Sequence, residues 1–267
     1  MQAEKFLVIG SDKKMQACRS RLTDLGFDAS CCDGDTLKQM LPFYCNIILP
    51  IPTLANGVIS GTGISVSELC EKLSENQLVF YGNLGNNPFG ASGKSYYNES
   101  FLVKNSRLTA QGTMRIILEN TDRDVYTLKA AVLGYGRCGR AICKSLQSNG
   151  VSTTVVTRNP FSAALAENER LESTDFKAFC KKAADFDVIV NTVPHNILSK
   201  KTMEKLTKRI LYIEIASKPY GFNINEIDKY NFRYVLAESL PGRFTPTSAG
   251  ANIADTVIEM IKEDKNE

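Results

Sequence analysis

Short apolar runs alternate along the chain with segments whose apolar residues recur at helical spacing. Runs rich in Val, Ile and Leu that alternate with helices are typical of parallel strands joined by crossover helices. In the first half, the runs are residues 6–9, 47–49 and 78–81, and the helical segments are residues 15–25 and 66–75. This half therefore predicts a small α/β domain, which we place at residues 1–108.

The second half repeats the alternation over a longer series of runs. Residues 109–121 carry apolar side chains at helical spacing and predict a connecting helix, after which residues 122–246 predict a doubly wound Rossmann domain. Strands are expected at residues 129–133, 153–157, 188–193, 210–215 and 233–236, and helices at residues 138–147 and 176–184. The amphipathic residues 247–262 predict a terminal helix that returns to the first domain. The expected fold class is thus α/β with two domains.

Composition excludes several classes of function. The 32 basic and 29 acidic residues are spread along the chain without a basic block, which argues against a nucleic-acid partner. The chain shows no signal peptide and no membrane-spanning apolar run, so we expect a cytoplasmic protein with no membrane partner. Eight cysteines without a Cys-x-x-Cys pair and a single histidine give no zinc set, so we expect reduced cysteines and no metal.

A glycine motif, Gly134-Tyr135-Gly136-Arg137-Cys138-Gly139, follows an apolar strand and opens a helix. In this context Gly-x-Gly-x-x-Gly binds a dinucleotide, because the glycines allow a tight turn and close approach of the pyrophosphate to the helix N-terminus. The alternative is a glycine turn in a domain that binds no nucleotide.

The next strand ends in Thr157-Arg158-Asn159, at the place where NAD-dependent enzymes carry an acidic residue for the ribose hydroxyls. A guanidinium can pair bidentately with a 2′-phosphate. We therefore expect NADP as the cofactor, the alternative being that Arg158 is a solvated loop residue.

Ligands of open α/β sheets lie beyond the carboxyl ends of the strands. The segments Thr192-Val193-Pro194 and Ala216-Ser217 follow later strands and are expected to contact the cofactor. Lys218 and Arg243 are candidate clamps for a substrate carboxylate, with exposed surface cations as the alternative. His195 is the single histidine and lies past a strand end, but hydride transfer does not require it, and we assign no catalytic residue.

Several segments in order resemble the family of dipicolinate synthase A subunits. They are Ile47-Ile48-Leu49-Pro50, Gln111-Gly112-Thr113, the glycine motif, Asn191-Thr192-Val193-Pro194, Ala216-Ser217-Lys218-Pro219-Tyr220-Gly221, Leu240-Pro241-Gly242 and Pro246-Thr247-Ser248-Ala249-Gly250. The chain departs from the family pattern at His195, Glu238-Ser239, Arg243 and Thr247.

The resemblance implies oxidation of dihydrodipicolinate, or of its 4-hydroxytetrahydro precursor, to dipicolinate, with NADP as hydride acceptor. It also implies a flavoprotein-like partner, the second subunit of the enzyme, and the mother cell of a sporulating bacterium as the location. A homo-oligomer stays open. Carried over to this chain, the resemblance makes Thr113 and Ser248 substrate-binding residues, each at a helix start whose N–H groups face a carboxylate. For Thr113 the alternative is a plain helix start with Thr109 as N-cap.

Two other functions stay open from the sequence. One is an NADP-dependent dehydrogenase of another small hydroxy or keto acid, since two-domain chains of this kind act on many substrates. The other is a subunit that binds NADP(H) as a sensor and catalyses nothing.

Overall fold

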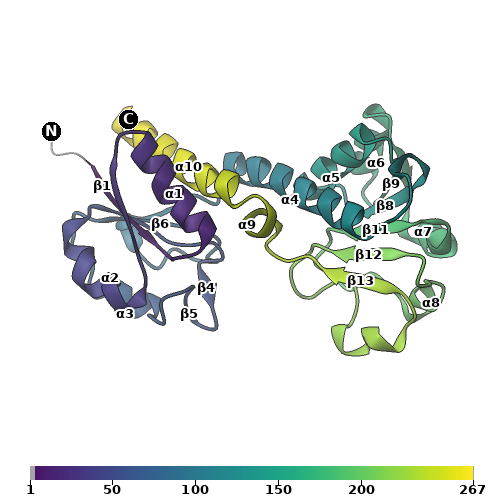
Figure 1. The fold of residues 1–267 in the computed structure, drawn as a ribbon, viewed down its shortest axis with the longest axis horizontal. Helices are drawn as coiled ribbons and strands as arrows, with labels where there is room; N and C mark the ends of the chain where they lie inside the picture. Colours follow the sequence, from purple (N-terminus) through teal and green to yellow (C-terminus); the bar gives the residue numbers. More distant parts are fainter. Residues whose placement is uncertain (1–3, 267) are drawn as a thin grey trace. The chain divides into compact units, whose positions relative to one another are not determined.

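The computed structural model describes residues 4–266, which form two compact units (Figure 1). The first unit combines the chain up to Asn105 with the residues from Pro241 onward, and the second spans Ser106–Leu240. The second unit thus ends six residues before the expected boundary at 246, because a short helix, α9 (Leu240–Phe244), leads directly into the terminal helix α10 (Pro246–Asn266).

The first unit contains a five-stranded parallel sheet in the order β2-β1-β3-β6-β7. Its strands are β1 (Lys5–Ile9), β2 (Asp28–Cys32), β3 (Asn46–Ile48), β6 (Leu78–Tyr81) and β7 (Gly93–Ser95). Its helices are α1 (Lys13–Asp24), α2 (Gly34–Met40), α3 (Val66–Cys70), α9 and α10, and β4 (Leu54–Ala55) pairs with β5 (Val58–Ile59) in a small hairpin. The strand order is that of flavodoxin-like sheets.

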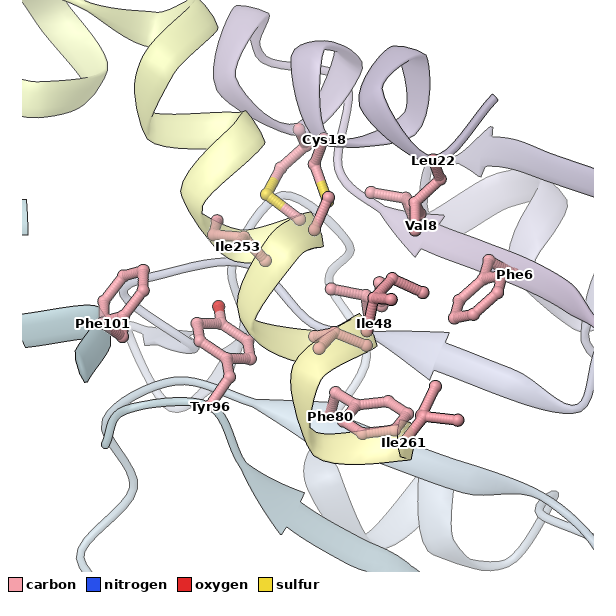
Figure 2. Packing of buried hydrophobic residues seen from close by; sticks show 14 residues of the cluster. Phe6, Val8, Cys18, Leu22, Ile48, Phe80, Tyr96, Phe101, Ile253 and Ile261 are labelled. Carbon is pink, nitrogen blue, oxygen red and sulfur yellow. The ribbon is translucent and has the colours of Figure 1, made fainter. Parts of the chain in front are cut away.

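Both faces of this sheet are covered, which explains its continuous apolar runs. Side chains alternate along β1, so Phe6 and Val8 lie on one face and Leu7 and Ile9 on the other. On the Phe6 face, α1 and α10 lie side by side and close the core (Figure 2). The α10 residues in this core are Ile253, Ala254, Val257, Ile258 and Ile261.

The second unit contains a six-stranded parallel sheet in the order β10-β9-β8-β11-β12-β13. Its strands are β8 (Lys129–Leu133), β9 (Ser152–Val156), β10 (Glu172–Thr174), β11 (Val188–Asn191), β12 (Leu211–Glu214) and β13 (Arg233–Leu236). The helices between its strands are α5 (Arg137–Ser148), α6 (Pro160–Asn168), α7 (Phe176–Lys182) and α8 (Lys200–Met203). In sequence terms the order is 3-2-1-4-5-6, that of the Rossmann fold, with its switch point between β8 and β11.

Helix α4 (Glu99–Glu119) begins ten residues before the helix that we expected at 109–121. Asn98 precedes it and accepts a hydrogen bond on its side-chain oxygen from Phe101 N (2.9 Å), so Asn98 occupies the capping position that we gave to Thr109. The expected helix start at Gln111-Gly112-Thr113 is therefore wrong. These residues lie inside the helix, where backbone N–H groups are used by the preceding turn.

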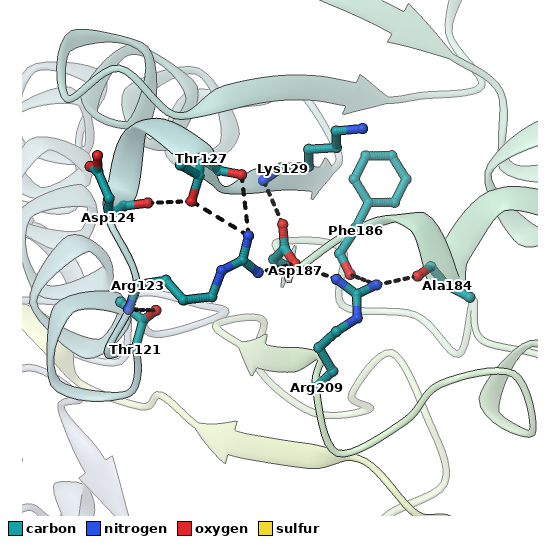
Figure 3. A network of polar contacts seen from close by, with 9 residues as sticks. All are labelled: Thr121, Arg123, Asp124, Thr127, Lys129, Ala184, Phe186, Asp187 and Arg209. Atoms are coloured by element: carbon teal, nitrogen blue, oxygen red, sulfur yellow. Dashed lines mark hydrogen bonds and ion pairs between the residues drawn. The ribbon is translucent and has the colours of Figure 1, made fainter.

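A buried carboxylate ties together the amino ends of β8 and β11 (Figure 3). Asp187 forms ion pairs with Arg123 (2.7 Å) and Arg209, and accepts a hydrogen bond from Lys129 N (2.9 Å). Burial raises the pKa of Asp187, but the hydrogen bonds from Lys129 N and Arg123 outweigh it and leave the pKa below its ordinary value. The carboxylate is therefore ionised and stabilising in the folded protein.

Replacing Asp187 by Asn is expected to lower the free energy of unfolding at pH 7 by about 1–3 kcal/mol, since an amide cannot accept all three donors. A lowered folded pKa contributes stability that is present above the unfolded pKa and lost as pH falls through the folded one. The difference between the variant and the wild type should thus persist to about pH 4 and shrink only below it. Urea unfolding across this pH range measures it, with exposed Asp185→Asn as the matched control. Equal losses of stability in Asp187→Asn and Asp185→Asn would contradict a stabilising role of the Asp187 carboxylate.

Candidate functional site

The turn after β8 has the backbone form that the first glycine of the motif must supply. Gly134 has φ +93°, a left-handed conformation that favours glycine, and its N–H donates to Val156 O (2.8 Å) in the next strand. A Cβ at Gly134 would lie 2.7 Å from Thr192 Oγ1 and 2.8 Å from Val193 Cγ2. The turn therefore packs closely against the residues that follow the neighbouring strand β11.

The other two glycines of the motif differ in what surrounds them. A Cβ at Gly139 would lie 2.2 Å from Gly134 O, so this glycine lets α5 pack against the turn. At Gly136, by contrast, no atom lies within 4 Å of an added Cβ. Gly136 is the N-cap of α5 and supplies no side chain to cap it. The helix N-terminus thus opens onto unfilled space, an arrangement that suits a pyrophosphate and fits a dinucleotide.

The remaining motif residues lie around this turn. Tyr135 is buried and its hydroxyl donates to Glu169 Oε2 (2.7 Å), so its side chain has a packing partner in the same unit. Burial, followed by this hydrogen bond, raises the pKa of Tyr135. Arg137 is exposed on the first turn of α5, and Cys138 next to it is half-buried. Burial raises the pKa of the Cys138 thiol, so it is a neutral thiol at pH 7.

The loop after β9 presents Arg158 to solvent while its two neighbours are used locally. Thr157 Oγ1 accepts from Asn159 N (3.2 Å), and the Asn159 side chain caps α6 by accepting from Phe161 N (2.9 Å). Arg158 is exposed. The loop backbone is therefore fixed by local hydrogen bonds, and the Arg158 guanidinium is the group at this strand end that is free to contact a ligand from solvent.

The segment after β11 is bound to the glycine turn. Thr192 donates through both its N–H (3.0 Å) and its hydroxyl (2.8 Å) to Leu133 O, the last residue of β8. Val193 is half-buried, and Pro194 and His195 are exposed. This segment therefore lies at the switch point, beside the turn that would hold the pyrophosphate.

A buried glutamate, which the sequence pattern did not predict, joins this segment to the loop after β12. Glu214 is 1% exposed, and its carboxylate accepts hydrogen bonds from four donors. They are Asn191 Nδ2 (2.8 Å), Gly221 N (2.8 Å), Ala216 N (3.1 Å) and Tyr212 OH (3.2 Å). Burial raises the pKa of Glu214 to about 6 against the opposing effect of these donors. An acidic residue directly after the apolar run Leu211-Tyr212-Ile213 was the signal in the sequence.

The loop after β12 continues with the residues expected near the nicotinamide and the substrate. Ala216 is buried, and Ser217 and Lys218 are exposed. The hydroxyl of buried Tyr220 donates to Glu238 Oε1 (2.6 Å), which follows β13. Lys218 lies with Tyr220 along an open groove of the second unit. A cation and a tyrosine–carboxylate pair are thus present at this end of the sheet.

The substrate-binding residues expected from the resemblance fall in both units. Thr113 belongs to the second unit but is buried (1% exposed), and its hydroxyl donates to Thr109 O (2.9 Å) within α4. The structure therefore gives Thr113 no helix N-terminus to present. Arg243 and Ser248 belong to the first unit, where Arg243 is exposed with its guanidinium 5.0 Å from the centre of the Phe244 ring. Ser248 is exposed in the first turn of α10.

Two other classes of site are missing from the described part of the chain. Across residues 4–266, no three or more His, Cys, Asp or Glu side chains are arranged to hold a metal ion. No helix within these residues is long and apolar enough to cross a bilayer.

Comparisons with known proteins agree with this geometry. Residues 125–234 match the family model of the acetohydroxy acid isomeroreductase NADPH-binding domain. The A subunit of dipicolinate synthase from Bacillus subtilis (strain 168) is 26% identical over 97% of this chain and 96% of that protein. The crystal structure of the dipicolinate synthase A chain from Bacillus subtilis has a TM-score of 0.81 at 24% identity, covering 100% of this chain and 99% of that one.

Two further structures share the fold. The A subunit of dipicolinate synthase from Bacillus halodurans has a TM-score of 0.82 at 21% identity, over 96% of this chain and 97% of that one. A D-lactate dehydrogenase from Treponema pallidum has a TM-score of 0.60 at 11% identity, over 98% and 97%. The comparisons confirm the α/β fold class and the resemblance to the family of dipicolinate synthase A subunits. The family match and the curated relative support an oxidoreductase with a nicotinamide cofactor.

Proposed function

We propose that this chain, which resembles the dipicolinate synthase A subunits over nearly its whole length, oxidises dihydrodipicolinate, or its 4-hydroxytetrahydro precursor, to dipicolinate. The similarity over 97% of the chain to the Bacillus subtilis protein carries this proposal. The expected partner is a flavoprotein-like second subunit, in keeping with the subunit name of that relative. The expected place is the cytoplasm of the mother cell during sporulation.

The second unit supplies the cofactor site in this proposal. The α5 N-terminus at Gly136 receives the pyrophosphate, and Gly134 and Gly139 keep the turn compact. Thr192-Val193-Pro194 and Ala216-Ser217 contact the nicotinamide half at the carboxyl ends of β11 and β12. Bound NADP would supply the hydride acceptor. Dihydrodipicolinate becomes dipicolinate by loss of the hydride and of one proton, which passes to the surrounding water or to a side chain, and the 4-hydroxytetrahydro precursor loses a molecule of water as well. The protein mainly orients the reacting ring carbon.

The proposed substrate is a dicarboxylate, and cationic side chains can pair with its carboxylates. Lys218 is the candidate in the second unit, and Arg243 and the α10 start at Ser248 are candidates in the first. Thr113 is not carried into this proposal, because its hydroxyl is buried and bonded within α4.

We propose NADP rather than NAD because of Arg158. It is exposed at the end of β9, on a loop whose backbone is fixed by Thr157 and Asn159, and no acidic residue occupies this turn. The Arg158→Ala variant is expected to bind NADP about 10–100-fold more weakly, since a charge-assisted bidentate contact is worth about 1.5–3 kcal/mol. NAD, which lacks the 2′-phosphate, should bind both proteins equally.

Calorimetric titration with both dinucleotides measures this selectivity. Lys177→Ala, which removes an exposed cation from α7 in the same unit, is the matched control and should change neither affinity. Equal losses of NADP and NAD affinity in Arg158→Ala would assign the arginine a general role in folding the loop and leave NADP without its support.

Turnover tests the function itself. The protein is supplied with NADP and freshly generated product of dihydrodipicolinate synthase, with and without a flavoprotein-like second subunit, while NADPH and pyridine-dicarboxylate absorbance are followed. Both signals should rise together. Turnover of simple hydroxy or keto acids instead would favour a different dehydrogenase. Cofactor binding without turnover in any combination would favour a sensing subunit.

A further inference from the structure

The carboxylate of Glu214 lies where a charged group is costly unless it is fully paired. Glu214 is the last residue of β12, in the interior of the six-stranded sheet, and is 1% exposed. None of the ion pairs found among residues 4–266 includes it. Its charge is balanced instead by four hydrogen-bond donors, two on each oxygen. An ionised carboxylate held by neutral donors is sensitive to the position of every one of them.

Three of the four donors connect Glu214 to the segments that the proposed function assigns to the nicotinamide half, and the fourth, Tyr212 OH, lies within β12 itself. Ala216 N and Gly221 N belong to the loop after β12, at its two ends. Asn191 Nδ2 comes from the end of β11 and also donates to Val193 O (3.0 Å), while Asn191 Oδ1 accepts from Val193 N (2.9 Å). A single carboxylate therefore anchors one loop directly and the other through Asn191.

The packing around this anchor is tight at Gly221. A Cβ at Gly221 would lie 2.5 Å from the Tyr212 hydroxyl and 2.6 Å from Asn191 Nδ2. Glycine at 221 thus lets the backbone N–H reach the carboxylate. Ile197 N and Leu198 N in turn donate to Gly221 O (3.0 and 2.9 Å), which joins the chain after His195 to the same point.

We propose that Glu214 is a positioning residue, which holds the loops after β11 and β12 in one arrangement and thereby sets the affinity for the nicotinamide half of the cofactor. This inference rests on the proposed dinucleotide site. It assigns to a buried side chain, which does not itself reach the cofactor, control over the end of the site where hydride transfer takes place.

Replacing Glu214 by Gln keeps the shape of the side chain and removes its charge. One oxygen becomes an NH₂ group that faces the two donors of that oxygen, one of which is a backbone N–H. At least one anchoring hydrogen bond is therefore lost, and the NH₂ group and the backbone N–H oppose each other. The affinity for NADP is expected to fall about 10-fold, the equivalent of 1.4 kcal/mol. The affinity for 2′-phospho-ADP-ribose, which lacks the nicotinamide, should stay unchanged.

Calorimetric titration of the full chain with these two ligands is the test. Glu172→Gln makes the same chemical change at an exposed position of β10, at the far edge of the sheet, and should leave both affinities unchanged. Tyr212→Phe removes one donor with little change in volume, and should weaken NADP binding less than Glu214→Gln, again without effect on 2′-phospho-ADP-ribose. Retained binding of that ligand also reports that the second unit is folded.

The pH dependence gives a readout that a purely structural role would not move. Protonation of Glu214 turns an acceptor into a donor, so the ratio of NADP to 2′-phospho-ADP-ribose affinity should fall several-fold from pH 7.5 to 5.5. Both ligands carry the same 2′-phosphate, whose titration cancels in the ratio. The titratable groups that face Glu214 are the Tyr212 and Tyr220 hydroxyls, the latter bonded to Glu238, and both pKa values are raised, chiefly by burial and by the glutamate bond respectively. Neither hydroxyl titrates between these pH values.

The outcomes are distinct. A ratio that falls with acid in the wild type and is flat in Glu214→Gln supports the proposal. Equal losses for both ligands in Glu214→Gln, or unchanged NADP affinity in that variant, overturn it. If the wild type binds neither ligand, the proposed dinucleotide site itself is contradicted. This outcome is distinct from a failure of the Glu214 proposal, because it is seen in the wild type without any change at Glu214.

Discussion

The Gly136→Val variant is expected to lose NADP affinity by about 100-fold or more, or about 3 kcal/mol, while its free energy of unfolding falls by no more than about 1 kcal/mol, since valine is a poorer N-cap residue than glycine. Gly136 has φ −82° and ψ −164°, a backbone conformation that other residues also adopt. No atom lies within 4 Å of an added Cβ, so the folded protein accommodates the larger side chain. The space that this side chain fills is where the pyrophosphate would meet the α5 N-terminus.

Calorimetric titration with NADP and urea unfolding of the same sample separate the two effects. Gly85→Val is the matched control, since an added Cβ there also has no neighbour within 4 Å, in a loop of the first unit. It should change neither quantity. If Gly136→Val binds NADP as well as the wild type, the open space at the helix start is not the cofactor site.

The second large effect concerns stability. Gly250→Val is expected to lower the stability of the first unit by about 3 kcal/mol, at the upper end of what overpacking costs. A Cβ at Gly250 would lie 2.2 Å from Lys14 O and 2.5 Å from Cys18 N. Both are backbone atoms of α1, so a whole helix must shift away from α10. The shift would open the core that Ile253 and Val257 form with α1.

Differential scanning calorimetry with and without NADP measures this change. A ligand raises the unfolding temperature only of the unit that binds it. The transition whose temperature NADP does not change therefore reports on the first unit. That transition should fall by about 10 °C. Gly242→Val is the matched control, because its Cβ would meet only the Lys14 side chain, at 4.0 Å. A similar fall in both variants would mean that the close approach at Gly250 is not what stabilises the unit.

Strands with strong apolar character were predictable, including the edge strand β13, and the other three edge strands of the two parallel sheets were not. The runs at residues 129–133 and 233–236 coincide with β8 and β13. Strands β2, β7 and β10 were missed, because each lies at an edge of its sheet and is partly exposed. An edge strand buries little surface, so selection for apolar residues is weak and the local sequence resembles a loop.

The site divides in the same way. The glycine motif and Arg158 could be proposed as site residues from the sequence, because each proposal depends on residues adjacent in sequence. The Glu214 anchor could not, because its donors Asn191 and Gly221 come from separate segments that meet only when β11 and β12 pair. The position of Thr113 was assigned wrongly for a related reason. Two good capping residues, Asn98 and Thr109, precede apolar residues at helical spacing, and local sequence does not say which one begins the helix.

The sequence by itself determined the α/β class, the glycine turn after β8 and the central strands, since each follows from side-chain periodicity or from backbone freedom at single residues. Only the tertiary structure decided the strand orders, the close approach of α10 to α1 at Gly250, and the burial of Glu214 between two loops. These features depend on contacts between segments far apart in the chain. The free energy of each contact arises when both partners are removed from water together, so it cannot be predicted from the local sequence of either partner.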